Sequence, residues 1–167
     1  MEREHKACDC PRAEKAALRL IARAEQSYSG LSRKLEKRGY EKDCIDRVLS
    51  VLVEMRILDD HRFVRLWLES RLSRRTDSPR RLLSSLCARG IERDDAQSGL
   101  KTALDTETEW ELLTRYVKKL EKSKSFRKGT AVSTSSRGTR PVRPLKLILK
   151  SEGFSPRTIQ RFCELED

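Results

Sequence analysis

The chain has 167 residues, of which 38% are charged and 37% hydrophobic, with a formal net charge of +11 at pH 7. No apolar run approaches the roughly eighteen residues that a membrane-spanning helix needs, and the first six residues lack the apolar stretch of a signal peptide. The five cysteines, an odd number, fit reduced thiols better than a disulfide framework. We therefore expect a cytoplasmic protein without a membrane partner.

Residues 1–11 read as a flexible polar tail, and residues 12–58 as a first group of three helices. The first helix is predicted over about 12–25, and Ser27 is a natural N-cap for the second. The second helix carries Leu31 and Leu35 toward Gly39. The third ends near Arg56, and its apolar stripe comprises Ile45, Val48, Leu49, Leu52 and Val53.

A second group of three helices is predicted over 59–105. Asp59 and Asp60 offer carboxylates to the free N–H groups at the start of the fourth helix. Its apolar residues include Phe63, Val64, Leu66, Trp67, Leu68 and Leu72. Ser78-Pro79 restarts the chain as a fifth helix, because serine caps and proline fits the first helical position. The sixth helix follows Gly90.

A third group is predicted over 106–167, interrupted by a flexible basic loop at about 122–141. Thr106 and Glu109 have the spacing of a capping box that opens the seventh helix. Ser155-Pro156 opens the ninth, with Ile159, Phe162 and Leu165 on its buried face. Nothing predicts a strand, since apolar residues never alternate over a useful length. The predicted fold class is all-α, with nine helices in three groups.

One pattern recurs in all three groups: two leucines four apart, then a glycine, then a large apolar residue. The glycines are Gly39, Gly90 and Gly153, each four residues after the second leucine. This spacing predicts a helix that ends at a glycine in the left-handed conformation, with the next residue packed back on the helix. The pattern therefore predicts tandem modules that share cores with their neighbours.

The net charge resides in one segment, because the rest of the chain sums to zero. Between Thr114 and Lys150 twelve Lys and Arg stand against a single acid, Glu121. Such a segment suits a polyanion backbone, whereas a solvated linker explains the same composition. The candidate nucleic-acid or filament-binding residues are Arg115, Lys118, Lys119, Lys122, Lys124, Arg127, Lys128, Arg137, Arg140, Arg143, Lys146 and Lys150.

No catalytic, metal or cofactor site is predicted. No serine or cysteine nucleophile is recognisable beside His61. The adjacent pair Asp59-Asp60 lies where a helix begins, so helix capping explains at least one of the two carboxylates. There is no phosphate-binding glycine loop, so any dependence on ATP must come from a partner. We expect a protein that is not an enzyme.

Three runs of the sequence together resemble the RecX family, the regulators of the bacterial RecA recombinase. They are SYSGLSRKLEKRGY at 27–40, ILDDHRF at 57–63 and SPRRLLSSLCARGI at 78–91. The resemblance extends from Ala16 to about Leu165. Its family-motif residues include Leu58, Asp59, Asp60, Arg62 and Phe63, beside the three repeat glycines.

The resemblance implies an elongated, curved array of three three-helix repeats that binds in the groove of the RecA–single-stranded-DNA filament. There it would modulate recombinase, ATPase and co-protease activities, in the sense of inhibition, and so affect recombination, DNA repair and the SOS response. The implied partners are the RecA filament and single-stranded DNA, with duplex DNA as a further ligand, and the protein is expected to be a monomer. Two alternatives stay open: a helix-turn-helix-like DNA-binding transcription regulator, and a purely structural helical adaptor.

Overall fold

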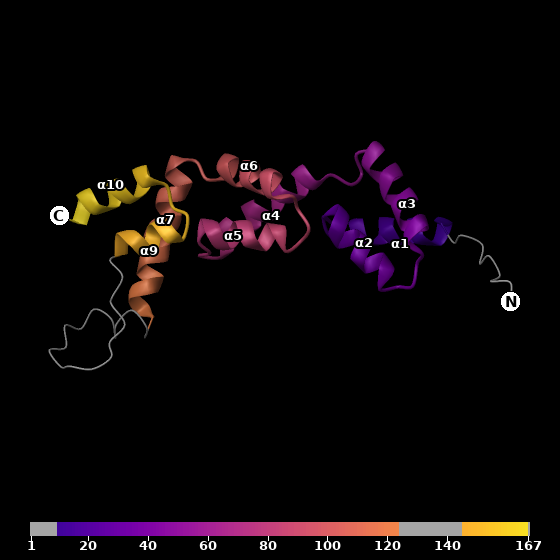
Figure 1. Ribbon diagram of the computed structural model, residues 1–167, viewed down its shortest axis with the longest axis horizontal. Helices are drawn as coiled ribbons and strands as arrows, with labels where there is room; N and C mark the ends of the chain where they lie inside the picture. Colours follow the sequence, from indigo (N-terminus) through magenta and orange to yellow (C-terminus); the bar gives the residue numbers. More distant parts are fainter. Residues whose placement is uncertain (1–9, 124–144, 167) are drawn as a thin grey trace. The chain divides into compact units, whose positions relative to one another are not determined.

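The computed structural model of the protein describes residues 10–123 and 145–166. Within these ranges the chain forms nine α-helices and no strand, which confirms the predicted all-α class (Figure 1). The helices are α1 (Cys10–Ile21), α2 (Tyr28–Glu36), α3 (Lys42–Glu54), α4 (Asp60–Arg74), α5 (Pro79–Cys87), α6 (Arg93–Ala103), α7 (Thr106–Lys122), α9 (Leu145–Ser151) and α10 (Pro156–Glu166). None of these helices is long and apolar enough to cross a bilayer.

The chain divides into two compact units. The first comprises Met1–Trp67 and Ser85–Gly99, and the second comprises Leu68–Ser84 and Leu100–Asp167. Helices α4, α5 and α6 therefore each contribute residues to both units. Helices α1 to α3 lie wholly in the first unit, and α7, α9 and α10 lie wholly in the second.

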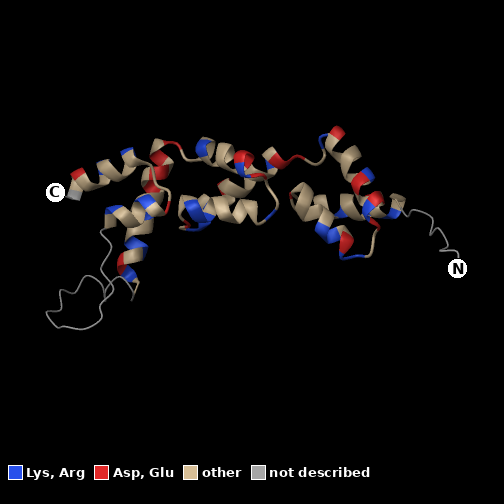
Figure 2. Cartoon of the chain, viewed as in Figure 1, with Lys and Arg blue, Asp and Glu red and all other residues tan. Residues whose placement is uncertain are grey.

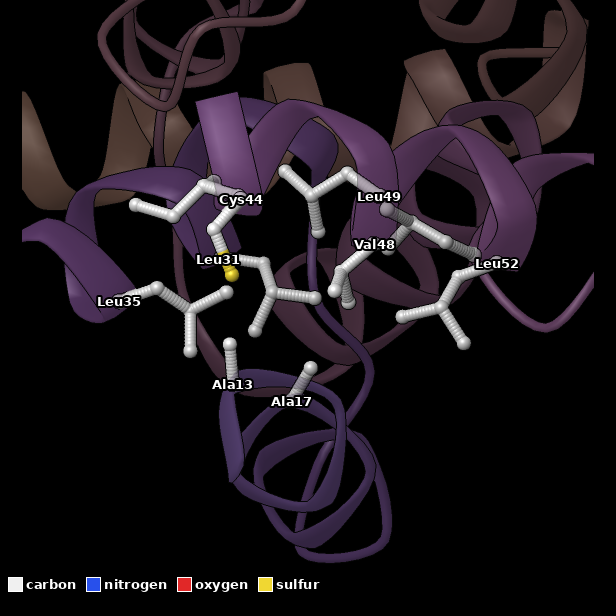
Figure 3. Close-up of a cluster of buried hydrophobic side chains, with 10 residues drawn as sticks. Ala13, Ala17, Leu31, Leu35, Cys44, Val48, Leu49 and Leu52 are labelled. Atoms are coloured by element: carbon white, nitrogen blue, oxygen red, sulfur yellow. The ribbon is translucent and has the colours of Figure 1, made fainter. Parts of the chain in front are cut away.

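The core of the first unit forms where α1, α2 and α3 meet (Figure 3). Small residues on α1, Ala13 and Ala17, face the leucines of α2, and all four side chains are fully buried. Helix α3 closes the core with Cys44, Ile45, Val48, Leu49 and Leu52. Alanines at the α1 contact let the helices approach closely, while the leucines supply most of the apolar area that leaves water.

All three repeat glycines end their helices as predicted. Gly39, Gly90 and Gly153 have φ values of 83°, 82° and 87°. After each glycine the next amide donates back to the second leucine of the repeat, at 3.4, 3.3 and 3.3 Å. A left-handed residue followed by this backbone bond is the Schellman ending of a helix. The sequence pattern therefore identified a real structural repeat.

The three predicted serine caps are confirmed, Ser155 by accepting from Thr158 N at 3.3 Å, and one predicted helix start is corrected. The Ser27 side chain accepts from Gly30 N at 3.1 Å, and Ser78 Oγ accepts from Arg81 N at 3.3 Å. The seventh helix begins differently, because Asp105 is its N-cap and accepts from Thr108 N at 2.8 Å. The predicted capping box at 106–109 was therefore wrong by one residue.

The core of the second unit is built around α7. Its residues Leu112, Leu113 and Val117 are buried, as are residues on α9 and α10. Two tilted aromatic pairs complete the packing, Trp110 with Phe162 at 6.1 Å between ring centroids and Tyr116 with Phe154 at 5.4 Å. Such pairs add specific geometry to the burial of apolar surface.

A few expected core positions lie at the surface instead. The first helix begins at Cys10, within the predicted tail at 1–11, whose residues 1–9 lie outside the described ranges. It ends at Ile21 rather than near residue 25, so Glu25 belongs to the connection between α1 and α2. Val53 is 45% exposed and Leu165 is 70% exposed, although both follow the apolar stripe of their helices. Leu66, on α4, is 40% exposed. Each lies at the edge of its stripe, where helical spacing alone does not decide burial.

Candidate functional site

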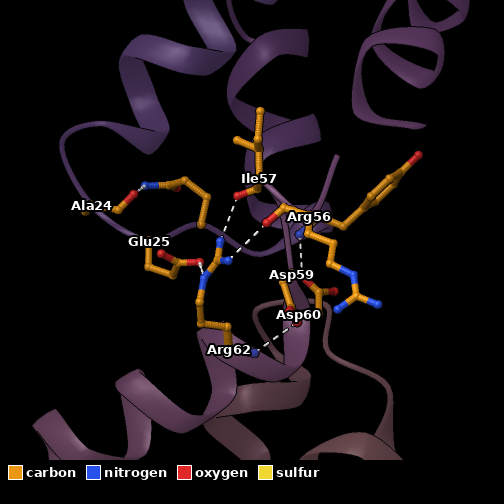
Figure 4. Close-up of polar contacts among 9 residues, drawn as sticks. Ala24, Glu25, Arg56, Ile57, Asp59, Asp60 and Arg62 are labelled. Carbon is orange, nitrogen blue, oxygen red and sulfur yellow. Dashed lines mark hydrogen bonds and ion pairs between the residues drawn. The ribbon is translucent and has the colours of Figure 1, made fainter. Parts of the chain in front are cut away.

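The run at residues 57–63, which contributes to the family resemblance, forms a polar junction between α3 and α4 (Figure 4). Arg62 lies at its centre. Its guanidinium donates from Nε to Glu25 Oε1 at 2.7 Å, and from its two terminal nitrogens to the carbonyls of Arg56 and Ile57 at 3.0 and 2.7 Å. One side chain thus binds the α1–α2 connection and the carbonyls that follow α3.

Arg56 ends α3 in an uncommon way. Its φ is 54°, which makes it the non-glycine residue with a left-handed backbone among those that the structure describes. The Ile57 N–H returns to the Leu52 carbonyl at 2.9 Å, as in the glycine turns. Because arginine has a β-carbon, this conformation costs about 1–2 kcal/mol, and the bond from Arg62 to the Arg56 carbonyl helps to hold it.

The two adjacent aspartates have different roles and opposite pKa shifts. Asp59 caps α4 by accepting from Arg62 N at 3.0 Å, and this bond lowers its pKa below the ordinary value. Asp60 accepts from Tyr28 N, at the start of α2, at 2.7 Å. Burial raises the pKa of Asp60 despite that bond, and the charges of Asp59 and Asp95 raise it further. Asp59 therefore caps α4 as predicted, whereas Asp60 binds the first N–H of α2 rather than the start of α4.

The other motif residues serve packing. Leu58 is 2% exposed and belongs to the core of the first unit, and Phe63 is half-buried on α4.

A cavity of about 440 Å³ adjoins the junction. It is lined by Tyr28, Val53, Arg56, Leu58, Asp59, Asp60 and His61. The junction holds three helix ends together. Within the described ranges no group of three or more His, Cys, Asp or Glu could hold a metal ion.

The second candidate site is the basic segment, of which the structure describes six cations. Arg115, Lys118, Lys119 and Lys122 lie on α7, while Lys146 and Lys150 lie on α9 (Figure 2). The remaining candidates and most of the predicted loop at 122–141 lie outside the described residues. They are Lys124, Arg127, Lys128, Arg137, Arg140 and Arg143.

The described cations of α7 fall into two kinds. Arg115 donates to the Leu72 carbonyl at 3.0 Å, and Lys119 donates to the Thr76 carbonyl at 3.0 Å. Both bonds satisfy backbone carbonyls at and just beyond the C-terminal end of α4, where positive charge is favourable. Lys118 and Lys122, like Lys146 and Lys150 on α9, are exposed. These four are the described candidates best placed to meet a phosphate backbone.

Sequence reasoning missed two further features of the second unit. Arg80, far from the basic segment in sequence, lies beside the end of α9, where its guanidinium donates to the Ser151 carbonyl at 3.3 Å. Glu109 is 8% exposed and accepts from Ser155 N and Ser155 Oγ, both at 2.7 Å, and from Thr158 Oγ1 at 2.6 Å. Glu109 therefore completes the start of α10. No local signal could have revealed either contact.

The fold and the junction define a class: all-α proteins built from three-helix modules that end their middle helices in a glycine turn. The model of the RecX first three-helix domain matches residues 13–52, and that of the second matches residues 59–100. The regulatory protein RecX of Treponema pallidum (strain Nichols) is 36% identical over 160 residues, covering 96% of this chain and 88% of its own. The chain belongs to the RecX family of regulatory proteins.

Further RecX proteins and structures are also similar to this chain. The regulatory protein RecX of Halorhodospira halophila is 35% identical over 95 residues, which cover 57% of this chain and 56% of that protein. The crystal structure of RecX from Lactobacillus salivarius is similar with a TM-score of 0.67 at 16% identity, over 93% of this chain and 95% of that one. A further crystal structure of regulatory protein RecX gives a TM-score of 0.72 at 17% identity, over 93% of this chain and 71% of that one. At such identities the structures establish the fold.

Proposed function

We propose that this protein binds the RecA–single-stranded-DNA filament and inhibits its recombinase, ATPase and co-protease activities. The observation that carries the proposal is membership of a family of regulatory proteins through a match over 96% of the chain. Through this activity the protein would affect recombination, DNA repair and the SOS response. It acts in the cytoplasm as a monomer and catalyses no reaction of its own.

The proposed organisation is three repeats at 12–58, 59–105 and 106–167. A row of similar modules suits a filament because each module can meet an equivalent surface on successive subunits. Several weak contacts then add up to tight binding through their effective concentration. Two three-helix domains matched in order along the first hundred residues support this arrangement.

We assign the basic segment to the DNA of the filament. Lys118, Lys122, Lys146 and Lys150 are exposed on helices of one unit, in a stretch whose cations outnumber its acids twelve to one. Contacts to phosphates are independent of base sequence, as a regulator of filaments on any DNA requires. Single-stranded DNA is the expected ligand, and duplex DNA is expected to compete through the same charges.

The test measures two affinities for each variant: that for the assembled filament and that for free single-stranded DNA. Changing Arg137, Arg140 and Arg143 to alanine should weaken binding to free DNA while leaving most of the binding to the filament. A variant with Lys15, Arg19 and Arg23 changed to alanine removes the same charge from exposed positions of α1 and its end, and should alter neither. An equal loss of both affinities in the first variant would refute this division of labour.

The same measurements address the alternative of a helix-turn-helix-like DNA-binding transcription regulator. The helices that follow Gly39 and Gly90 carry acids in their first turns, Asp43 on α3 and Asp94 and Asp95 on α6, whereas α10, after Gly153, carries none there. Acidic first turns disfavour insertion into the major groove, where the N-terminal residues of a recognition helix approach base edges. Tight, sequence-dependent binding to duplex DNA without binding to the filament would establish the alternative and overturn the proposal.

A further inference from the structure

The glycine turns do more than end helices, because two of the three are docking points for another helix of the chain. In the first unit, the start of α2 docks on the turn that follows α5. Ser27 Oγ donates to the Arg89 carbonyl at 3.0 Å, and the Arg33 guanidinium donates to the Ala88 carbonyl at 3.4 Å. Ser29 lies so close to Gly90 that a β-carbon there would overlap it.

The second unit repeats this arrangement with different residues. The start of α5 docks on the turn that follows α9, where Arg80 N donates to the Glu152 carbonyl at 2.9 Å. The guanidinium of the same arginine donates to the Ser151 carbonyl at 3.3 Å. A β-carbon at Gly153 would lie 3.3 Å from Arg80 N. Ser29 and Arg80 are both the second residue of their helices.

The two interfaces share one chemistry. In each, a donor from a helix start reaches the carbonyl one residue before the glycine, and an arginine reaches the carbonyl two residues before it. Carbonyls at a helix end carry partial negative charge, so a helix N-terminus and a guanidinium complement them. The glycine gives room for the incoming helix as well as the left-handed turn.

The third turn, after α2, has the same conformation and no such occupant. Gly39 has a φ of 83°, and a β-carbon there would meet no described atom within 4 Å. Lys37 and Arg38, whose carbonyls correspond to the two acceptors of each interface, are exposed. We propose that this turn is an interaction surface that receives the start of a helix from a partner protein, with a hydroxyl or amide donor in its first turn and an arginine beside it.

We assign the occupant to a different protein, since the serine-capped helices of a second copy are already engaged. Three described helices have a serine N-cap, and each serine is engaged within its own chain. Ser27 contacts Arg89, Ser78 contacts Glu152, and Ser155 contacts Glu109. A second copy would have to give up one of these contacts to offer a serine-capped helix. The inference rests on the proposed function, which supplies the partner: a subunit of the recombinase filament.

The test compares the wild-type protein with Gly39→Asn for binding to the recombinase filament. Asparagine tolerates the left-handed conformation, so the variant keeps the turn while placing a side chain where the helix would dock. Arg56→Asn is the matched control, since it places the same side chain at another left-handed helix end of the same unit, after α3. We expect Gly39→Asn to weaken filament binding at least tenfold, with the melting temperature changed by no more than a few degrees, and the control to bind like the wild type.

The outcomes separate this inference from the proposed function. If the wild type binds the filament and Gly39→Asn binds equally well, the docking inference is wrong and the proposed function stands. If the wild type does not bind the filament, both are wrong. A wild-type protein that sediments as a dimer, with Gly39→Asn monomeric and filament binding unchanged, would assign the surface to a second copy and overturn the choice of partner.

Discussion

Ser29 and Gly90, sixty-one positions apart in the sequence, are in direct contact, and the absence of a β-carbon at position 90 makes that contact possible. Gly39 shares the same backbone conformation without a neighbour at its α-carbon. Gly39→Ala should therefore cost only the left-handed strain, about 1–2 kcal/mol of unfolding free energy. Gly90→Ala should cost at least roughly 2 kcal/mol more, because overpacking adds to that strain.

Chemical denaturation of the two variants checks this difference. Ser29→Gly removes the side chain that alanine at position 90 would meet, so the double variant Ser29→Gly, Gly90→Ala should recover most of the extra loss. The coupling free energy of this cycle measures the contact. Equal losses of unfolding free energy for Gly39→Ala and Gly90→Ala would show that the contact with Ser29 adds no cost at position 90.

Arg62 is predicted to stabilise the first unit through its fork of donors. Arg62→Ala should lower the unfolding free energy by about 2 kcal/mol, since it leaves Glu25 and two carbonyls without their donor. Arg62→Lys should recover less than half of the loss, because an ammonium cannot reach three acceptors as a planar guanidinium does. Thermal denaturation of both variants tests this, and full rescue by lysine would assign the effect to charge alone.

The opposite pKa shifts of Asp59 and Asp60 predict opposite pH dependences. The pKa of Asp59 is lowered, so its stabilisation is present above the ordinary aspartate pKa and is lost as the pH falls through the folded value. Asp59→Ala should cost about 1 kcal/mol near pH 7 and progressively less toward pH 3.

The pKa of Asp60 is raised, so the folded state favours its protonated form, and that contribution is lost as the pH rises through the folded value. Asp60→Asn keeps an acceptor for Tyr28 N without the buried charge, so it should be at least as stable as the wild type at pH 7. Its advantage should shrink as the pH falls. Denaturation profiles at a series of pH values decide both cases, and parallel profiles for the two variants would contradict the assignment.

Glu109 is predicted to be essential to the second unit because it is buried and accepts three hydrogen bonds at the start of α10. Glu109→Ala should lower the unfolding free energy by about 3 kcal/mol, and Glu109→Gln by roughly 1 kcal/mol, because glutamine keeps one acceptor oxygen. Hydrogen exchange should report faster opening of α10 amides in the alanine variant. Unchanged protection there would mean that apolar packing alone holds α10.

The exposed lysines of α7 and α9 predict a salt dependence. If Lys118, Lys122, Lys146 and Lys150 each meet one phosphate, changing all four to alanine should reduce the slope of log affinity against log salt for free single-stranded DNA by roughly 0.7 for each. The control variant changes to alanine Arg115 and Lys119, whose side chains donate to backbone carbonyls of the fold. It should lower the free energy of unfolding and leave the salt slope nearly unchanged. An unchanged slope in the quadruple variant would exclude these lysines from the DNA contact.

Local signals in the sequence identified most helix ends correctly. The glycine turns, the caps at Ser27 and Ser78 and the capping role of Asp59 depend on residues within one or two turns of each other. The start of α7 was misplaced because Asp105 and Thr106 are both capping residues, and only the structure shows which of them bonds an N–H. Local spacing therefore predicts the presence of a helix start reliably, but it predicts the exact first residue less well.

Contacts between distant residues could not be predicted. Glu109 has helical spacing for a capping box, yet its partners lie forty-six and forty-nine residues away. The run at 57–63 was recognised by family resemblance, but the three acceptors of Arg62 become evident only when the ends of α1 and α3 meet. Of the predicted basic residues, the structure shows Arg115 and Lys119 bonded to carbonyls of the fold, and the role of the others in DNA binding stays a prediction.

The measurement that tests the central claim most directly is ATP hydrolysis by the cognate RecA on single-stranded DNA, with and without this protein at substoichiometric amounts. An inhibitor that binds across several filament subunits should cause a progressive loss of hydrolysis at ratios well below one per subunit. An unchanged rate, together with tight binding to duplex DNA in a parallel assay, would contradict the account and favour a DNA-binding regulator.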